Sequence, residues 1–288
     1  MDAPTGLPPA SRGELRAARR LTRRKDRAAQ RLFLAEGPQA VREALGANCV
    51  QTVFVALSSS SRQGALIAAA EQVGVPVRVS ADDDLASLTD TQTPQGIVAV
   101  CRMADRSLDD ALSSRPRLVV GCAEVRDPGN AGTVIRCADA FGADAVILSE
   151  GSVDAYNSKT VRSSAGSLFH LPLVVGSPLN TIVDVARAAG LQVLAADGRG
   201  AADLAELTAR GELRRPTLWL LGNEAWGLAP EQAELADLRV RVPIYGAAES
   251  LNLGAAAAIC LYASATAQRT GMPSSNRQTD SPAASARS

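Results

Sequence analysis

Short, nearly continuous apolar segments alternate with helix-forming segments through the second half of the chain, and this alternation constrains the fold most. The predicted strands there are residues 118–121, 145–148, 171–175, 192–196, 217–221 and 240–244. The predicted helices are residues 131–141, 158–167, 181–189 and 251–268. Strands that are apolar on both faces are typical of a parallel sheet covered by helices on each side. This half is therefore predicted to be an α/β domain.

The first half alternates in the same way over shorter segments, which predicts a small α/β unit. A chain of 288 residues accommodates two ordinary domains. Their predicted bounds are 12–104 and 117–270, joined by a polar linker at 105–116. The Pro/Ala/Ser-rich start and the Ser/Pro/Gln/Arg-rich end, residues 1–11 and 271–288, are predicted to be disordered.

Charge is balanced over the whole chain, with 30 Lys and Arg against 30 Asp and Glu, but it is unevenly distributed. Between Arg12 and Arg31 there are nine basic residues and only two acids, Glu14 and Asp26. The balanced total argues against a uniformly basic nucleic-acid-binding protein. The N-terminal segment is instead a local basic patch.

The five cysteines are dispersed and form no CxxC pair, and His170 is the only histidine. A structural zinc site needs about four clustered ligands, so no metal is expected. Dispersed cysteines in apolar surroundings indicate reduced thiols and a cytoplasmic protein. No segment is apolar enough for a membrane span or a signal peptide. His170 lies between Phe169 and Leu171, which favours a packed structural histidine.

The first of three unusual polar loops, residues 127–136, follows a predicted strand and opens a predicted helix. Pro128 and Gly129 shape the turn, and Asn130 is placed to cap the helix. Arg136 lies about 1.7 helical turns further on, so its side chain need not be far from the loop. The loop matches neither the dinucleotide fingerprint nor the P-loop. The alternative is a plain helix start with a surface arginine.

In the second loop, residues 220–228, a strand leads into Gly222, then Glu224 and Gly227. A glycine at this point lets a ligand approach the backbone closely. The alternative is an ordinary connector with Glu224 near a helix N-terminus.

The third loop, residues 242–252, precedes a long Ala-rich helix. Ser250 is a candidate cap for that helix, which is the structural interpretation. The functional interpretation is that Ser250, Leu251 and Asn252 offer backbone donors and polar side chains to a small polar ligand.

In this order and spacing, the three loops closely resemble the signature motifs of the SpoU/TrmH class of RNA 2′-O-methyltransferases, in the SPOUT superfamily. The matching residues are Asn130, Gly132, Arg136, Gly222, Glu224, Gly227, Pro243, Ser250, Leu251 and Asn252. The segments 159–172, 32–37 and 93–97 also resemble parts of the family, so the likeness covers roughly residues 12–268.

The resemblance implies a C-terminal parallel-sheet domain with a deep trefoil knot, and a small N-terminal α/β domain that binds RNA. It implies S-adenosyl-L-methionine as methyl donor, no metal, and transfer to a ribose 2′-hydroxyl. By carry-over, the residues that hold the cofactor are Gly222, Val242, Ile244 and Leu251.

The resemblance also assigns catalytic roles. Arg136 is the family's candidate for activating the hydroxyl, but a guanidinium stays protonated near neutral pH. Stabilising the developing alkoxide, or acting through a phosphate, is physically easier than removing the proton. Asn130, Ser250 and Asn252 are expected to orient Arg136 and the ribose, and Glu224 to hold Arg136 or a backbone group.

RNA is the expected partner, with 23S ribosomal RNA favoured over transfer RNA and a homodimer implied by the family. The expected phosphate-binding residues are Arg19, Arg20, Arg23, Arg24, Lys25 and Arg162. The alternatives are a transfer-RNA 2′-O-methyltransferase and a non-catalytic RNA-binding or ribosome-assembly protein. An antibiotic-resistance role, through methylation of a drug's ribosomal target, fits within the main hypothesis.

Overall fold

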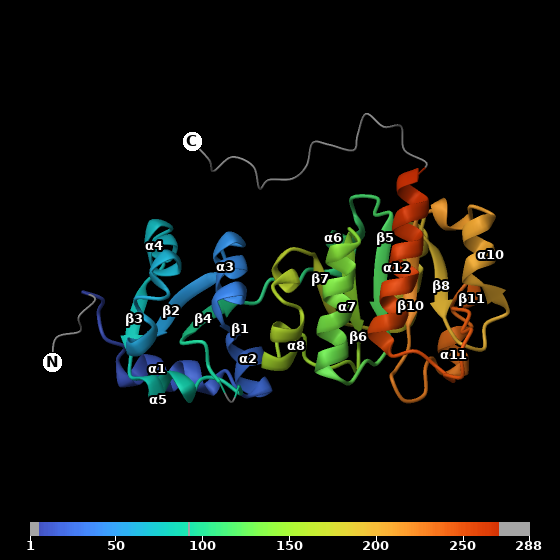
Figure 1. Ribbon diagram of the computed structural model, residues 1–288. Helices are drawn as coiled ribbons and strands as arrows, with labels where there is room; N and C mark the ends of the chain where they lie inside the picture. Colours follow the sequence, from blue (N-terminus) through green and yellow to red (C-terminus); the bar gives the residue numbers. More distant parts are fainter. Residues whose placement is uncertain (1–5, 92, 271–288) are drawn as a thin grey trace.

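A computed structural model describes residues 6–91 and 93–270, which form two sheets with their helices (Figure 1). The N-terminal sheet is mixed, with the strand order β1-β4-β2-β3. Its strands are Leu32–Glu36 (β1), Val50–Ala56 (β2), Val77–Ser80 (β3) and Ile97–Arg102 (β4). Its helices are Arg12–Arg20 (α1), Arg24–Gln30 (α2), Pro38–Gly46 (α3), Gly64–Gln72 (α4) and Asp82–Ala86 (α5).

The second sheet has seven strands in the order β7-β6-β5-β10-β8-β11-β9, and every pairing in it is parallel. The strands are Leu118–Cys122 (β5), Ala145–Ser149 (β6), Leu173–Ser177 (β7), Gln192–Ala196 (β8), Ala202–Asp203 (β9), Thr217–Leu221 (β10) and Leu238–Arg241 (β11). The helices are Leu108–Leu112 (α6), Pro128–Ala140 (α7), Ser158–Ser163 (α8), Leu179–Ala188 (α9), Leu204–Ala209 (α10), Pro230–Ala233 (α11) and Leu253–Thr270 (α12). The predicted parallel α/β domain is confirmed.

The central strands β5, β6, β8 and β10 are buried on both faces. Successive side chains of each strand point to opposite faces of the sheet. In β10, Leu218 and Leu220 pack with α6, α9 and α11. Trp219 and Leu221 pack on the other face with α7, α10 and α12. The Trp219 ring nitrogen donates a hydrogen bond to the Ser264 hydroxyl of α12 at 2.9 Å, which satisfies this buried polar group.

Several segments differ from the sequence prediction. The strand predicted at 240–244 ends at Arg241, because Pro243 has no N–H for further pairing. The segment predicted as a linker at 105–116 contains α6, whose Leu108 and Leu112 are buried against α9. Disorder was predicted for 1–11, but in residues 6–11 Pro8 and Ala10 pair with Val79 at the edge of β3. Residues 1–5 and 271–288 lie outside the described part of the chain.

The two sheets share one hydrophobic core across the domain boundary. Phe33 of β1 packs on Tyr156 and Phe169 of the second domain, with ring centroids 4.7 and 6.0 Å apart. The buried Arg27 guanidinium donates at 2.9 Å to Asp154 of the second domain and also to the Leu21 and Thr22 carbonyls, between α1 and α2. The domains are therefore joined by packing and by a buried ion pair.

Candidate active site

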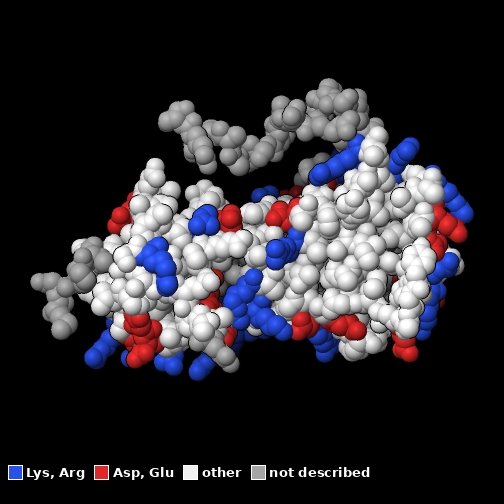
Figure 2. Space-filling model, viewed as in Figure 1, with Lys and Arg blue, Asp and Glu red and all other residues white. Residues whose placement is uncertain are grey.

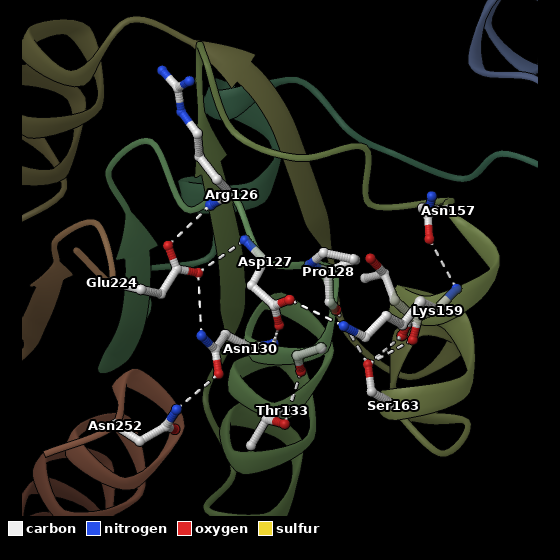
Figure 3. A network of polar contacts seen from close by, with 12 residues as sticks. Arg126, Asp127, Pro128, Asn130, Thr133, Asn157, Lys159, Ser163, Glu224 and Asn252 are labelled. Atoms are coloured by element: carbon white, nitrogen blue, oxygen red, sulfur yellow. Dashed lines mark hydrogen bonds and ion pairs between the residues drawn. The ribbon is translucent and has the colours of Figure 1, made fainter.

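The three polar loops meet at the carboxyl ends of β5, β10 and β11, where parallel α/β sheets place their sites (Figure 3). The Glu224 carboxylate lies at the centre. It accepts hydrogen bonds from the backbone N–H groups of Arg126 at 3.2 Å and Asp127 at 3.0 Å. It also accepts from the Asn130 side-chain amide at 3.3 Å. Glu224 of the second loop therefore fixes the backbone of the first.

Asn130 connects this carboxylate to the third loop. Its amide oxygen accepts from the Asn252 side-chain nitrogen at 3.1 Å. The Asn252 oxygen in turn accepts from the backbone N–H of Gly254, at the start of α12, at 2.8 Å. The chain of contacts Glu224–Asn130–Asn252 links all three loops, and the name loop network is used for it below.

The caps of both helices differ from the prediction. Asp127, and not Asn130, caps α7, because its carboxylate accepts from the Asn130 backbone N–H at 2.8 Å. This frees the Asn130 amide for the loop network. Asn252 accepts from the Gly254 N–H in the first turn of α12, so Asn252, and not the candidate Ser250, caps this helix. Ser250 is exposed instead.

Lys159 extends the polar contacts to α8 (Figure 3). Its ammonium group lies 3.0 Å from the second carboxylate oxygen of Asp127. The Asn130 N–H and the Lys159 ammonium together lower the pKa of the Asp127 carboxyl. The sequence analysis did not assign Lys159 a role, although it lies in a segment that resembles the family.

Gly222 is required by close packing of the second loop on itself. A Cβ at this position would lie 2.3 Å from the Gly227 carbonyl carbon and 2.4 Å from the Leu228 nitrogen. Asn223 and Gly227 form two backbone hydrogen bonds of 2.9 Å that close the loop. No other residue fits at 222 without moving this backbone.

A cavity of about 790 Å³ lies between the second and third loops and the end of β8. The four residues predicted to hold the cofactor, Gly222, Val242, Ile244 and Leu251, all line it. The candidate catalytic residues Glu224, Ser250 and Asn252 line it as well. Its size and its mixture of apolar walls and exposed backbone suit a ligand such as a nucleoside.

Further residues line this cavity, and of these Asp197 and Arg199 were missed in the sequence analysis. Trp226 is 53% exposed at the rim, and the Arg126 guanidinium lies 5.8 Å from its ring centre. Asp197 and Arg199 follow the end of β8. Burial opposes ionisation of Asp197, but the Arg199 N–H and the Arg239 guanidinium outweigh it and lower the pKa of this carboxyl. Asp197 and Arg199 directly follow the predicted strand 192–196, and this position could have identified them as candidate site residues.

Arg136 is not brought into the loop network. It is exposed on α7 and does not line the cavity, and its side chain forms no hydrogen bond or ion pair within residues 6–91 and 93–270. The predicted contact of Glu224 with a backbone group is observed, whereas a contact with Arg136 is not. The thiol of the neighbouring Cys137 lies 3.9 Å from the carbonyl oxygen of Gly254, at the start of α12.

The predicted phosphate-binding residues divide into two groups. Those of the basic segment are exposed on α1, on α2 and between these helices: Arg19, Arg20, Arg23, Arg24 and Lys25. Figure 2 shows Lys and Arg side chains along the lower edge of the N-terminal domain, where α1 and α2 lie in Figure 1. Arg162 instead donates at 3.1 Å to Glu36 across the domain boundary, a structural contact that the sequence analysis did not predict.

His170 also lies at the domain boundary, where its contacts are structural, but it is not packed as the sequence analysis predicted. Its ring is 43% exposed and lies between the carboxylates of Asp139 at 2.8 Å and Glu43 at 3.2 Å. Burial opposes protonation, but hydrogen bonds to both carboxylates outweigh it and raise the pKa of His170.

In the described part of the chain, no group of three or more His, Cys, Asp and Glu side chains is arranged to hold a metal ion. None of the helices of residues 6–91 and 93–270 combines the length and apolar character needed to cross a membrane.

Comparison with known proteins agrees with this architecture. Residues 117–262 match the model of the SpoU rRNA methylase family, and residues 13–99 match an MRM3-like substrate-binding domain. The chain is 37% identical over 245 residues to the 23S rRNA (guanosine(2553)-2′-O)-methyltransferase RlmP of Bacillus subtilis, covering 85% of this chain and 92% of that protein.

Solved structures show the same likeness. The SpoU methyltransferase AviRb of Streptomyces viridochromogenes, in complex with the cofactor AdoMet, is similar with a TM-score of 0.77 and 32% identity, over 89% of this chain and 99% of that one. An AdoMet-bound rRNA methyltransferase of Sinorhizobium meliloti is similar with a TM-score of 0.76 and 30% identity, over 93% and 98% of the two chains.

Proposed function

The chain belongs to the SpoU rRNA methylase family, and we propose that it transfers a methyl group from S-adenosylmethionine to a ribose 2′-hydroxyl of 23S ribosomal RNA. The observation that carries this proposal is the loop network. Glu224, Asn130 and Asn252 join the three signature loops beside one cavity of suitable size.

We propose that the cavity holds the cofactor. Val242, Ile244 and Leu251 provide apolar walls for an adenine ring, and the backbone around Gly222 provides hydrogen-bonding groups. When bound, S-adenosylmethionine supplies a methyl group on a positively charged sulfur. The sulfonium already activates this methyl group, so no metal is included in the proposal. The trefoil knot of the family remains a prediction for this chain.

The residues around the cavity have to position and stabilise the attacking ribose oxygen. Asn130 and Asn252 are held in place by the loop network, so their orientation is fixed before substrate binds. Ser250 is exposed at the same edge and is proposed to contact the ribose. Arg136 is proposed to stabilise the negative charge that develops on the oxygen as its proton leaves.

A homodimer is proposed, because Arg136 lies outside the cavity of its own chain. Apolar side chains are exposed around this cavity and on the outer face of α12, including Ile244, Leu251, Ile259 and Tyr262. Contiguous exposed apolar surface is typical of an interaction site. A second copy packed there would bring Arg136 of one chain toward the loops of the other.

The N-terminal domain is proposed to hold the RNA through the exposed cations of α1 and α2, which bind phosphates irrespective of sequence. Ribosomal RNA is favoured over transfer RNA because RlmP acts on 23S rRNA and is similar over nearly its whole length. The proposed location is the cytoplasm, which agrees with five free cysteines.

The test is transfer of labelled methyl groups from S-adenosylmethionine to unmodified 23S rRNA and, separately, to transfer RNA. We expect label in 23S rRNA at one linkage that resists alkaline cleavage. Arg136→Ala should abolish it, whereas Arg210→Ala, an exposed arginine of the C-terminal domain, should not. Label only in transfer RNA would overturn the substrate, and absence of both label and cofactor binding would favour a non-catalytic RNA-binding protein.

A further inference from the structure

A second cavity, of about 310 Å³, lies at the junction of the two domains. One side is formed by Arg24 and Ala28 of α2 and by Arg31, which follows this helix. The other side is formed by residues 148–156, at and after the end of β6, and by the end of β7. The basic segment of the N-terminal domain therefore meets the carboxyl edge of the parallel sheet here.

The lining combines apolar side chains with two arginines, Arg24 and Arg31, and three carboxylates, Asp105, Glu150 and Asp154; of these carboxylates, Asp105 pairs with Arg31 and Asp154 pairs with Arg27. Met103, Leu148, Val153 and Val175 supply apolar surface. Arg24 is exposed, and none of the residues in the described part of the chain forms an ion pair or side-chain hydrogen bond with its guanidinium.

Arg31 is 56% exposed and pairs with Asp105 at 2.8 Å. Asp105 also accepts a hydrogen bond from the Tyr156 hydroxyl at 3.1 Å. This second contact fixes the carboxylate and thereby holds the Arg31 guanidinium at the rim. Apolar surface beside guanidinium groups is what an unstacked RNA base and its phosphate require.

The wall of this cavity is bonded directly to the segment that enters the first loop. The Glu124 N–H donates to the Ser149 hydroxyl at 3.0 Å, and the Val153 N–H donates to the Val125 carbonyl at 2.8 Å. The next residues, Arg126 and Asp127, are the ones whose N–H groups bind Glu224. Only the segment 124–127 would therefore separate a ligand in this cavity from Glu224 of the loop network.

We propose that this cavity binds an unstacked nucleotide of the RNA substrate close to the one that is methylated, an inference that rests on the proposed function. Arg24 and Arg31 contact its phosphate, and the base lies on the apolar surface. Cations continue from this rim along α2 and α1, including Lys25, Arg23 and Arg19, which favours RNA over a neutral peptide as the occupant. The contact would set which nucleotide reaches the active site.

Ala28 and Ala29 provide a matched pair for the test. Both are exposed on α2, but only Ala28 lines the cavity. Ala28→Trp should fill it and raise both the Kd for 23S rRNA and the KM for methylation by about tenfold, the loss of roughly one stacked base. Ala29→Trp should behave like the wild type, and the Kd for S-adenosylmethionine should be unchanged in both. Equal RNA affinity of the two variants would overturn the inference.

Photo-cross-linking gives a second measurement on the unaltered protein. Ribosomal RNA transcripts containing 4-thiouridine should cross-link to peptides from residues 24–31 or 148–156. Cross-links confined to other peptides would refute the assignment. Because RNA binding and cross-linking do not depend on turnover, they test the cavity even if the wild-type protein transfers no methyl group, which would count against the proposed function alone.

Discussion

Replacing Glu224 by glutamine tests whether the loop network positions the active site. The carboxylate accepts three N–H donors, two through one oxygen and one, from Arg126, through the other. A glutamine amide of the same shape keeps one acceptor oxygen and places an NH₂ group where the second was. If the oxygen faces Asp127 and Asn130, the Arg126 N–H meets another donor.

The expected magnitude follows from that lost bond. A hydrogen bond to a charged group contributes about 1.5–3 kcal/mol. Glu224 is exposed, so water replaces part of the loss, and about 1–2 kcal/mol is a reasonable value here. If this energy holds the loops in their reactive arrangement, methyl transfer slows roughly 5- to 30-fold.

The assay is single-turnover methyl transfer with excess enzyme and saturating S-adenosylmethionine, together with a separate measurement of cofactor affinity. Glu231→Gln, an exposed position on α11, is the control and should leave the rate unchanged. A wild-type rate in Glu224→Gln would refute the reasoning. A wild-type rate combined with weaker cofactor affinity would show that the loops serve cofactor binding alone.

Three further predictions concern the cavity and the domain boundary. Gly222→Ala should abolish binding of S-adenosylmethionine, measured by calorimetry, because its Cβ would lie 2.3 Å from backbone; retained affinity would contradict the close packing. Arg27→Met should lower the free energy of unfolding by about 3 kcal/mol, since it leaves the partly buried Asp154 carboxylate without its arginine partner, whereas the exposed Arg23→Met should change it little; equal urea midpoints would show that the pair is not stabilising. Because the folded-state pKa of His170 is raised, its stabilisation is complete below about pH 6.5 and is lost as pH rises through the raised value. His170→Gln should therefore destabilise the protein more at pH 6 than at pH 9, and a pH-independent difference would argue against this ion pair.

The features predicted best from the sequence are those that depend on the local pattern of apolar and polar residues. The strands at 192–196 and 217–221 have the bounds that their apolar residues indicate, because both faces of these strands are buried. The three loops were located by their unusual polar residues at the ends of predicted strands, and their order and spacing carried the resemblance to the family. The two-residue strand β9 and the four-residue helix α11 were missed, because neither is long enough to show a periodic pattern.

Contacts between distant segments were not predictable in this way. Arg162 pairs with a glutamate 126 positions away, and His170 bonds one 127 positions away. Nothing local distinguishes such an arginine from one that binds phosphate, and the apolar neighbours of His170 indicated burial. The separation of Arg136 from the loop network likewise depends on the direction in which α7 presents its side chains, which spacing along a helix does not determine.

The shared core of the two domains fixes the distance between the proposed RNA-binding helices and the candidate active site. Since Phe33, Tyr156 and Phe169 pack together and Arg27 bonds Asp154, the basic helices are held at a set distance from the first loop. A flexible linker would let an anchored RNA offer many nucleotides to the same site. If RNA binds on α1 and α2 as proposed, it would present only the nucleotide that lies one fixed span from the point of attachment, and the nucleotide would be selected by its distance along the folded RNA.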